Sequence, residues 1–410
     1  MKNILYLHAG AEMYGADKVM LDLIKGLDKN KFRPVVVLPT DGVLVDALKD
    51  ENIEVKVIPY PIMRRKYFNP IGIIKYGFGL IKYSSQIAKL AKKENIDIIH
   101  NNTAAVLEGS IVSRKLKIPQ LWEIHEIIVN PKIMYKVTSK LIAKYSTITA
   151  TVSNAVKNHL MDSGYFKKDK IKVIYNGVDS KRFNPENDST YLRKDFNIPD
   201  NVKIIGMIGR VNSWKGQSDF LKAANILMEK HPDLYTVFVG NAFEGEEWRE
   251  EELNESISKS PNKDRIINMG YRTDSENIYS LFDIFVLPST NPDPLPTVVL
   301  EAMATGKPVV GYNHGGIREM VKENYNGYFA EVRNPEDLAR KIDTLLSDEN
   351  LIKDMGENSR KRLLSEFSID VYVKNYEDEY MRTIKNYRLN KEWGDNIGRE
   401  SRYFCNSTFL

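Results

Sequence analysis

Short apolar runs alternate along the chain with longer segments in which apolar residues recur every three or four positions. The runs predict buried strands and the longer segments predict amphipathic helices. This alternation is typical of a parallel sheet with helices on both faces. In the first half of the chain we expect strands at residues 4–7, 34–38, 55–58, 96–99 and 147–152. In the second half we expect strands at residues 203–208, 235–239, 265–269, 284–287 and 308–311.

A polar stretch between residues 183 and 199, which includes Pro185 and Asn187, interrupts the pattern and predicts a linker. We therefore expect two doubly wound α/β domains, at residues 1–183 and 184–368. A helix-period segment at 369–388 predicts a C-terminal helix that returns to the first domain, and the polar tail at 389–410 predicts little order. Parallel sheets bind ligands at the carboxyl ends of their strands, so we expect the ligand in a cleft between the domains.

The composition of the chain argues against several classes of protein. The 59 Lys and Arg residues nearly balance 55 Asp and Glu residues, which argues against a protein that wraps nucleic acid. The single cysteine, Cys405, permits no internal disulfide, which fits a reducing compartment and favours the cytoplasm. The apolar run at 4–7 is too short for a signal peptide, and no run reaches the roughly 18 residues of a membrane-spanning helix.

The loop after the first expected strand carries Gly10 and Gly15 and opens into a helix. The two glycines have the Walker A separation, but Ala16 and Asp17 stand where a P-loop needs Lys and then Ser or Thr. A glycine-bearing turn at a helix N-terminus can accept an anion. On these residues alone, an equally good interpretation is that the glycines serve only the geometry of the turn.

Two cations follow the first strand of the second domain, in the segment Gly-Arg-Val-Asn-Ser-Trp-Lys-Gly at 209–216. Arg210 offers a planar fork and Lys215 a point charge, and both can reach one phosphate group across the loop. Paired cations are also common on ordinary surfaces, so this segment predicts a phosphate site only together with others.

The densest segment runs from residue 288 to residue 308, where a proline-rich loop leads into a helix that begins near Pro296. Asp293 lies in the loop and Glu301 about one turn inside the helix, so one acid can reach a ligand and the other a ribose hydroxyl. An exposed helix acid is the alternative for Glu301. That alternative loses weight because the helix has little polar surface around Leu300, Ala302 and Met303.

Together these segments resemble the family 4 retaining glycosyltransferases, which have the GT-B fold of two Rossmann-like domains. The likeness runs from Ile4 to about Tyr380, and its most specific part is Asp293 to Glu301 followed by Ala-Met-Ala-Thr-Gly-Lys-Pro-Val-Val at 302–310. Supporting matches are Thr-Val-Ser-Asn at 151–154, Val-Ile-Tyr-Asn-Gly-Val-Asp at 173–179, Gly209-Arg210 with Lys215-Gly216, and His-Gly-Gly-Ile-Arg-Glu at 314–319.

The resemblance implies a hexosyltransferase that moves a sugar from a UDP or GDP type of nucleotide sugar to a hydroxyl of a glycan or lipid-linked glycan, in cell-surface polysaccharide synthesis. Arg210 and Lys215 would then hold the donor diphosphate, Glu301 the ribose and Asp293 the hydroxyls of the transferred sugar. His125 would lie near the anomeric carbon, so that His125 and Asp293 form the catalytic pair.

Further donor contacts follow from the same resemblance. Tyr271 or Arg272 would lie near the base, and Gly15 would approach the donor. Pro296 replaces a glycine often found in the family and cannot donate a hydrogen bond to phosphate. Amides of the next helix turn remain as donors: Thr297, Val298 and Val299. Asp293 stands where the family commonly has Glu, which shortens the reach of this acid.

The sequence predicts neither a metal nor a cofactor. No two histidines are three or four residues apart, and no Asp-x-Asp occurs in the chain. Of the other histidines, His100 follows an apolar run, where it can line the cleft or be satisfied by neighbouring backbone.

Two alternatives to a transferase share the fold or the ligand. One is a nucleotide-sugar hydrolase or epimerase, which would act on the donor without an acceptor. The other is a non-catalytic partner or sensor that binds the nucleotide sugar. The whole set of segments favours the transferase.

The segment from residue 63 to residue 93 is basic, rich in aromatic residues and free of acids. Such a composition is typical of a surface that attaches to anionic lipid at the inner face of the cell membrane. A pair of amphipathic helices that pack on the first sheet is an equal alternative, because Gly72, Gly77 and Gly79 disfavour one long helix. The basic residues are Arg64, Arg65, Lys66, Lys75, Lys82, Lys89, Lys92 and Lys93.

Overall fold

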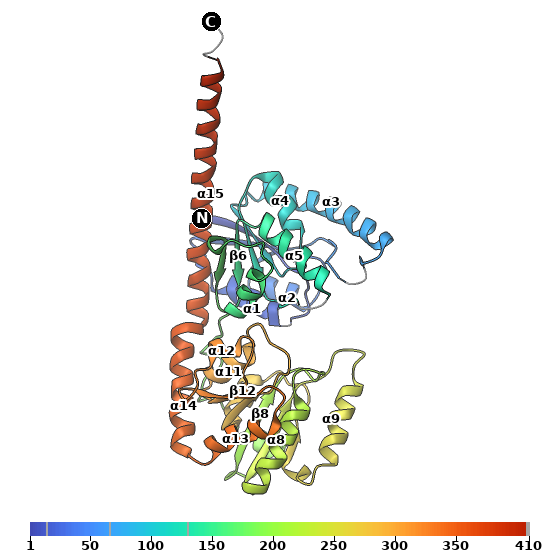
Figure 1. Ribbon diagram of the computed structural model, residues 1–410, viewed down its shortest axis with the longest axis vertical. Coiled ribbons are helices and arrows are strands. Elements are labelled where there is room, and N and C mark those ends of the chain that lie inside the picture. Colours follow the sequence, from blue (N-terminus) through green and yellow to red (C-terminus); the bar gives the residue numbers. More distant parts are fainter. Residues whose placement is uncertain (14, 65–66, 129–130, 407–410) are drawn as a thin grey trace. The chain divides into compact units, whose positions relative to one another are not determined.

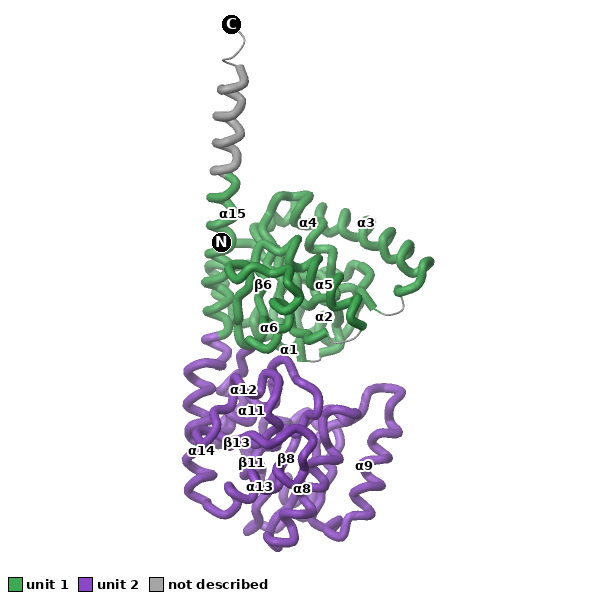
Figure 2. Tube along the Cα trace, in the orientation of Figure 1, with its two compact units in different colours: residues 1–175, 372–410 green, residues 176–371 purple. Residues whose placement is uncertain are grey.

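The chain folds into two compact units in a computed structural model that describes residues 1–406 except 14, 65–66 and 129–130, with backbone alone for 392–406. The first unit comprises residues 1–175 and 372–410, and the second comprises residues 176–371 (Figure 2). The predicted boundary at residue 183 lies inside the second unit, because Val178 donates its N–H to the carbonyl of Phe367 and Phe183 packs against Tyr279.

The first unit is built on a seven-stranded sheet with the order β3-β2-β1-β4-β5-β6-β7, and all paired strands are parallel. The sequence pattern did not predict two of these strands, β5 and β7. Gln120 and Glu123 break the apolar run of β5, and β7 has only three residues. The strands are β1 (Lys2–Leu7), β2 (Phe32–Leu38), β3 (Glu54–Val57), β4 (Ile98–Asn102), β5 (Gln120–Ile124), β6 (Ile148–Thr151) and β7 (Ile171–Val173).

Helices cover both faces of this sheet, as its alternating side chains require (Figure 1). Leu5 and Leu7 of β1 pack in one apolar cluster with Ile87 of α3, whereas Tyr6 points to the other face and meets Tyr380 of α15. The helices are α1 (Gly15–Gly26), α2 (Val43–Asp50), α3 (Pro70–Lys93), α4 (Glu108–Leu116), α5 (Lys132–Tyr145), α6 (Asn154–Met161) and α15 (Ile369–Asn406).

Helix α3 is one continuous helix of 24 residues, so the alternative of a pair of helices is wrong. Asn69 caps its start by accepting the N–H of Gly72, and Pro70 occupies the first turn, where its missing N–H costs nothing. The later turns are held by burial of Ile87, Ala88 and Ala91 against the sheet. Tertiary packing here outweighs the low helix propensity of the three glycines.

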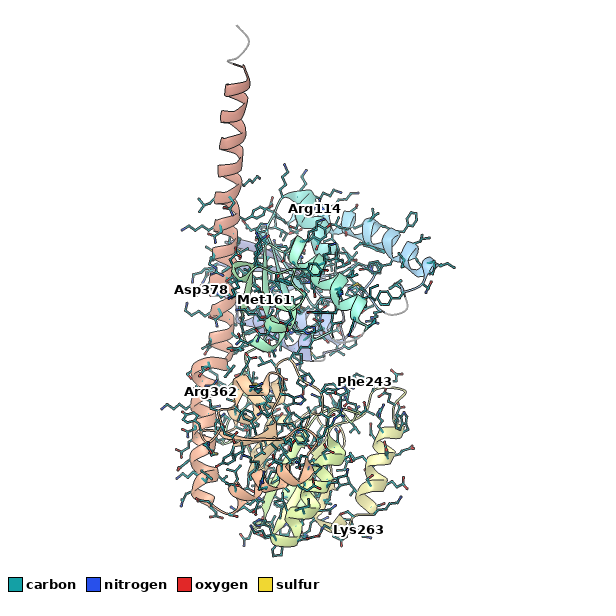
Figure 3. All side chains as sticks on the ribbon, viewed as in Figure 1. Arg114, Met161, Phe243, Lys263, Arg362 and Asp378 are labelled. Carbon is teal, nitrogen blue, oxygen red and sulfur yellow. The ribbon has the colours of Figure 1, made fainter. Side chains whose placement is uncertain are left out.

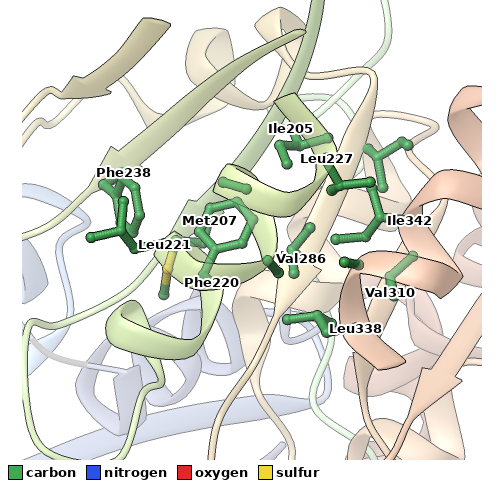
Figure 4. Packing of buried hydrophobic residues seen from close by; sticks show 14 of the residues in the cluster. Ile205, Met207, Phe220, Leu221, Leu227, Phe238, Val286, Val310, Leu338 and Ile342 are labelled. Atoms are coloured by element: carbon green, nitrogen blue, oxygen red, sulfur yellow. The ribbon is translucent and has the colours of Figure 1, made fainter. Parts of the chain in front are cut away.

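The second unit has a six-stranded parallel sheet with the order β10-β9-β8-β11-β12-β13. Figure 4 shows its core, in which Phe220 and Leu227 of α8 and Leu338 and Ile342 of α13 pack on Val286 and neighbouring strand residues. The strands are β8 (Lys203–Ile208), β9 (Leu234–Val239), β10 (Ile266–Asn268), β11 (Ile284–Leu287), β12 (Val309–Tyr312) and the unpredicted β13 (Gly327–Ala330).

The expected linker at 183–199 is partly structural in the second unit. It contains the short helix α7 (Thr190–Asp195), whose Leu192 is fully buried. The other helices are α8 (Gln217–Lys230), α9 (Trp248–Ser258), α10 (Ser275–Leu281), α11 (Thr297–Ala304), α12 (Ile317–Met320), α13 (Pro335–Leu346) and α14 (Glu349–Arg362).

The last helix, α15, continues to Asn406, so the prediction of little order is wrong for residues 389–406. No proline interrupts this stretch, and a polar sequence can continue a helix that packing has already started. Residues 407–410 of the predicted tail lie outside the described residues. Within the described part of the chain, no helix combines the length and apolar character needed to cross a membrane.

Candidate functional site

Lys215 and Asp293 form an ion pair in the second unit. The Lys215 ammonium lies 2.8 Å and 3.0 Å from the two carboxylate oxygens of Asp293. Their side chains are only 16% and 9% exposed, so the pair is largely shielded from water. Two residues that the sequence assigned separately to the diphosphate and to the sugar are therefore in contact.

Backbone contacts hold the two loops of this pair together. Thr290 donates its N–H to the carbonyl of Trp214 over 2.7 Å. Gly216 has a φ of 83°, and a Cβ there would lie 1.9 Å from the carbonyl oxygen of Pro288. Only glycine satisfies both the left-handed conformation and this close approach.

The His-Gly-Gly segment at 314–316 supports the Asp293 loop from another side. Gly316 donates its N–H to the carbonyl of Asp293 over 2.8 Å, and His314 Nε2 donates to the carbonyl of Ser289 over 2.6 Å. A Cβ on Gly316 would lie 2.1 Å from the carbonyl oxygen of Pro294. These glycines therefore fix where Asp293 lies.

Glu301 lies on α11 and accepts a hydrogen bond of 2.7 Å from the hydroxyl of Tyr279. The ring of Tyr279 is fully buried between Phe183 and Phe285. Tyr279 thus orients Glu301, a role that the sequence did not reveal because the two residues come from different helices.

Arg210 extends from the loop after β8 and lies over the ring of Phe243, with 3.9 Å between the guanidinium carbon and the ring centroid. Phe243 is labelled in Figure 3. Its guanidinium also donates to the carbonyl of Ala242 over 3.4 Å. Phe243, itself half exposed, was missed by the sequence analysis. An arginine that rests on an aromatic face keeps its planar fork in a defined orientation.

The two residues predicted to lie near the nucleotide base, Tyr271 and Arg272, have different environments in the structure. Arg272 forms a bidentate pair with Asp274, at 2.9 Å and 2.7 Å, and its hydrogen bonds lower the pKa of Asp274 to about 2. Tyr271 is 68% exposed. Arg272 is thus engaged within the second unit, and Tyr271 is the better candidate for stacking on a base.

The predicted amide donors lie at the start of α11, where Thr297 is the first residue. The N–H of Val299 donates to the carbonyl of Pro296 over 3.1 Å within this first turn. The assignment of Thr297, Val298 and Val299 as phosphate donors stays a prediction. In the first unit, Gly15 begins α1 and a Cβ there would meet nothing within 4 Å, so packing does not require glycine at this position.

His125 directly follows β5 in the first unit, and its side chain is 11% exposed. Its Nε2 lies 2.7 Å from Asn102 Oδ1 and 3.3 Å from Glu123 Oε1. Burial alone would lower the pKa of His125, but the carboxylates of Glu123, Glu126 and Asp17 together outweigh burial and raise the pKa.

His100 corresponds to neither of its two sequence interpretations. It is fully buried, and side chains rather than backbone groups satisfy its ring: Glu123 at Nε2 over 2.8 Å and Tyr380 at Nδ1 over 2.5 Å. Within the described residues, no group of three or more His, Cys, Asp or Glu side chains could hold a metal ion.

Solved structures share this arrangement of two parallel-sheet units. A glycosyltransferase from Rickettsia africae is 26% identical with a TM-score of 0.82, and the match covers 94% of this chain and 99% of that chain. HepE from Anabaena, solved with UDP and glucose, is 25% identical with a TM-score of 0.79, covering 92% and 99% of the two chains. The fold is therefore GT-B, and the class is that of the glycosyltransferases.

Family models identify the particular family. The model for glycosyl transferases group 1 matches residues 188–362, and the model for glycosyltransferase family 4 matches residues 13–182. The chain belongs to this family of glycosyltransferases, as the sequence predicted.

Curated relatives cover nearly the whole chain. The UDP-Gal:alpha-D-GlcNAc-diphosphoundecaprenol alpha-1,3-galactosyltransferase of Escherichia coli is 27% identical, over 91% of this chain and 95% of the relative. The N,N'-diacetylbacillosaminyl-diphospho-undecaprenol alpha-1,3-N-acetylgalactosaminyltransferase of Campylobacter jejuni is 29% identical, over 92% and 98%.

Proposed function

We propose that this glycosyltransferase moves a sugar from a UDP-sugar to a hydroxyl of a lipid-diphosphate-linked glycan, with retention of the anomeric configuration and without a divalent metal. The contact between Lys215 and Asp293 carries this proposal, because it joins the cation that we assign to the leaving diphosphate to the acid that we assign to the transferred sugar. The names of the E. coli and C. jejuni relatives, which both act on diphosphoundecaprenol-linked sugars, support the class of acceptor.

Charge that develops during the reaction explains why cations are needed at the diphosphate. Cleavage of a sugar–phosphate bond places negative charge on the leaving diphosphate and positive charge on the anomeric carbon. Fixed cations at the diphosphate stabilise this transition state more than the ground state, and this difference accelerates the reaction. Arg210, held on Phe243, and Lys215 can supply that charge in place of a metal.

Retention follows from a front-face route, in which an oxygen of the leaving diphosphate takes the proton of the acceptor hydroxyl. The bond from the anomeric carbon to the diphosphate breaks, and the bond to the acceptor oxygen forms on the same face. This route needs no covalent nucleophile. His125 would contact the transferred sugar near the reacting carbon.

The donor site predicts a specific loss of binding in Glu301→Ala. If the Glu301 carboxylate holds the ribose hydroxyls, its loss removes a charged hydrogen bond, so donor affinity is expected to fall by about 1.5–3 kcal/mol. Isothermal titration with UDP measures this affinity. Tyr279→Phe, which frees Glu301 from its buried partner, is expected to weaken UDP binding less.

A thermal-shift series identifies the base of the donor. UDP-sugars are expected to raise the melting temperature of the wild type, because a ligand that binds only the native state stabilises it. GDP-sugars and ADP-sugars serve as controls.

A Glu301→Ala protein that is folded and binds UDP with wild-type affinity would contradict the ribose assignment.

A membrane surface would present such an acceptor, and α3 has the features of an interfacial helix. On its N-terminal half, Ile71, Ile74, Phe78 and Ile81 are between 62% and 78% exposed. Their spacing of three, four and three residues places them on one face of the helix. Figure 1 shows α3 at the periphery of the first unit.

Charges flank this apolar face. Lys75, Lys82 and Lys89 follow at seven-residue spacing, and all three are exposed. Two further exposed apolar side chains, Ile133 and Val137, lie on α5. Each cation contributes on the order of 1 kcal/mol near anionic lipid, and a buried Ile or Phe side chain contributes about 1.5–3 kcal/mol. Arg65 and Lys66 of the predicted segment lie outside the described residues.

Vesicle co-sedimentation tests this surface. The wild type is expected to bind vesicles that contain phosphatidylglycerol more tightly than vesicles of phosphatidylcholine alone, and high salt is expected to weaken the binding. Ile74→Ser with Phe78→Ser is expected to lower the affinity at least about tenfold, because two apolar side chains no longer enter the lipid.

The matched control is Ile226→Ser, which changes a 41% exposed isoleucine of the second unit. This variant is expected to bind like the wild type. Equal binding by the α3 double variant, or binding indifferent to lipid charge, would contradict the assignment of α3 to the membrane.

A further inference from the structure

A chain of buried polar side chains leads from the last helix to His125 in the first unit. The hydroxyls of Tyr6 and Tyr380 are 2.9 Å apart, and Tyr380 in turn lies 2.5 Å from His100 Nδ1. Glu123 bridges the two imidazoles, with 2.8 Å to His100 Nε2 and 3.3 Å to His125 Nε2. The side chains of His100 and Glu123 are at most 1% exposed.

Strand geometry explains why these residues meet. His100 and Asn102 are two residues apart on β4, and Glu123 precedes His125 by two residues at the end of β5, so each pair points to one face of the sheet. Asn102 and Glu123 are direct partners in the register of the two strands. The helix α15 covers that face with Tyr380 and with Tyr376, whose ring stacks on His100 at 5.4 Å.

The partners determine where the protons lie. His125 Nε2 faces two acceptors, Asn102 Oδ1 and Glu123 Oε1, so Nε2 carries the proton and donates. His100 Nε2 likewise donates to Glu123 Oε2, which leaves His100 Nδ1 to accept from the hydroxyl of Tyr380. Tyr6 then donates to Tyr380. When Glu123 is ionised, this assignment of donors and acceptors is consistent for every side chain in the series.

We propose that Glu123 is a positioning residue, which keeps the proton of His125 on Nε2 and so leaves Nδ1 as the nitrogen available to reactants, and that Tyr380 of α15 holds Glu123 in place through His100. The inference rests on the assignment of His125 to the reacting centre under the proposed function. It adds the final helix, far from His125 in the sequence, to the machinery of the site.

The charges around His125 are consistent with this role. Glu123, Glu126 and Asp17 all favour the protonated ring of His125, with Glu123 the largest of the three influences. Tyr6, Tyr372, Tyr376 and Tyr380 face Glu123 from β1 and α15, and burial raises the pKa of each of these hydroxyls, so all four remain neutral. Glu123 is therefore the anion that faces both imidazoles.

Nitrogen NMR of the full chain with ¹⁵N-labelled histidine tests the proposal without any assay of activity. The spectrum of His125→Ala identifies the His125 signals. In the wild type, His125 is expected to be the Nε2–H tautomer with a pKa above the ordinary 6.5. In Glu123→Gln the pKa of His125 is expected to fall by about one unit or more, because the neighbouring negative charge is gone.

A folded Glu123→Gln protein in which His125 keeps both its tautomer and its pKa would overturn the proposal. This outcome would leave the transferase assignment untouched, because the measurement uses no substrate. Conversely, a shifted His125 in a protein that transfers no sugar would contradict the proposed function and leave the positioning role intact.

Tyr380→Phe tests the part played by α15. Loss of its hydroxyl is expected to lower kcat by up to about tenfold, the scale of one hydrogen bond, with the KM for the donor unchanged. The matched control is Tyr372→Phe, a buried tyrosine of α15 whose hydroxyl has no hydrogen-bond partner among the described residues. Equal loss of activity in the two variants would reduce Tyr380 to a packing role and contradict the inference.

Discussion

Lys215→Ala is expected to lower kcat by about 100-fold or more, the scale observed when one preorganised charge-stabilising group is removed. Its ammonium lies within 3.0 Å of both oxygens of Asp293, so the variant loses the cation that stabilises the leaving diphosphate and leaves a mostly buried carboxylate without its partner. Steady-state kinetics at saturating donor measure the first effect, and thermal unfolding measures the second.

The matched control is Lys222→Ala, which removes an exposed lysine of α8 in the same unit. This protein is expected to retain wild-type kinetics and stability. Lys215→Arg is expected to keep the ion pair with Asp293 but to recover only part of kcat, because a planar guanidinium does not place its charge where the compact ammonium does. A folded Lys215→Ala protein with full activity would contradict the proposal that Lys215 stabilises the leaving diphosphate.

His125→Ala is expected to lower kcat by about 100-fold or more, with little change in the affinity for UDP. The imidazole is held by Asn102 and Glu123 in the first unit, whereas the nucleotide contacts, apart from Gly15, are assigned to the second unit. A group that acts near the reacting carbon affects the transition state more than donor binding. Separate measurements of kcat and of the dissociation constant for UDP distinguish the two effects.

His231→Ala is a suitable control, because it removes an imidazole that pairs with Asp343 in the second unit and that no part of the mechanism uses. Its kcat is expected to match the wild type. If His125→Ala instead weakened UDP binding and left kcat unchanged, the histidine would belong to donor recognition rather than to the reacting centre.

Much of the fold could be predicted because the sheet residues are apolar in short runs. The strands β1, β2, β8 and β11 each contain a short apolar run that is mostly buried, and this pattern suffices to indicate a parallel sheet. The strand β5 was missed for a physical reason. Its Gln120 and Glu123 are buried polar residues, and the hydrogen bond that makes the burial of Glu123 tolerable comes from His100 on another strand.

The residues that we assign to the donor site of the second unit were chosen from the sequence, but their contacts with one another could not be predicted. Arg210, Lys215, Asp293 and Glu301 were chosen from local segments. Which of them pair depends on how loops separated by many residues meet, as with the bond between Thr290 and the carbonyl of Trp214. Arg272 differs in this respect, because its partner Asp274 is only two residues away in the sequence.

The buried side chains that lead to His125 come from residues that are far apart in the sequence. Glu123 and His100 lie on neighbouring strands, and alternation along each strand gives a weak local signal in the patterns His-x-Asn and Glu-x-His. Tyr380 comes from a helix at the other end of the sequence, with 280 positions between it and His100. Only the packing of α15 on the sheet joins them, and no local pattern predicts that contact.

Transfer to a defined acceptor is the most direct test of the central claim. The purified full chain would be incubated with UDP-galactose, UDP-glucose or UDP-N-acetylgalactosamine and a synthetic lipid-diphosphate-linked N-acetylhexosamine, in buffer that contains EDTA. We predict that one of these donors yields UDP and a glycosylated lipid in equal amounts, and that the anomeric coupling constant in the proton NMR spectrum shows the α configuration of the donor. Release of UDP without a glycoside, a product of inverted configuration, or transfer that stops in EDTA and returns with Mg²⁺ would contradict the account.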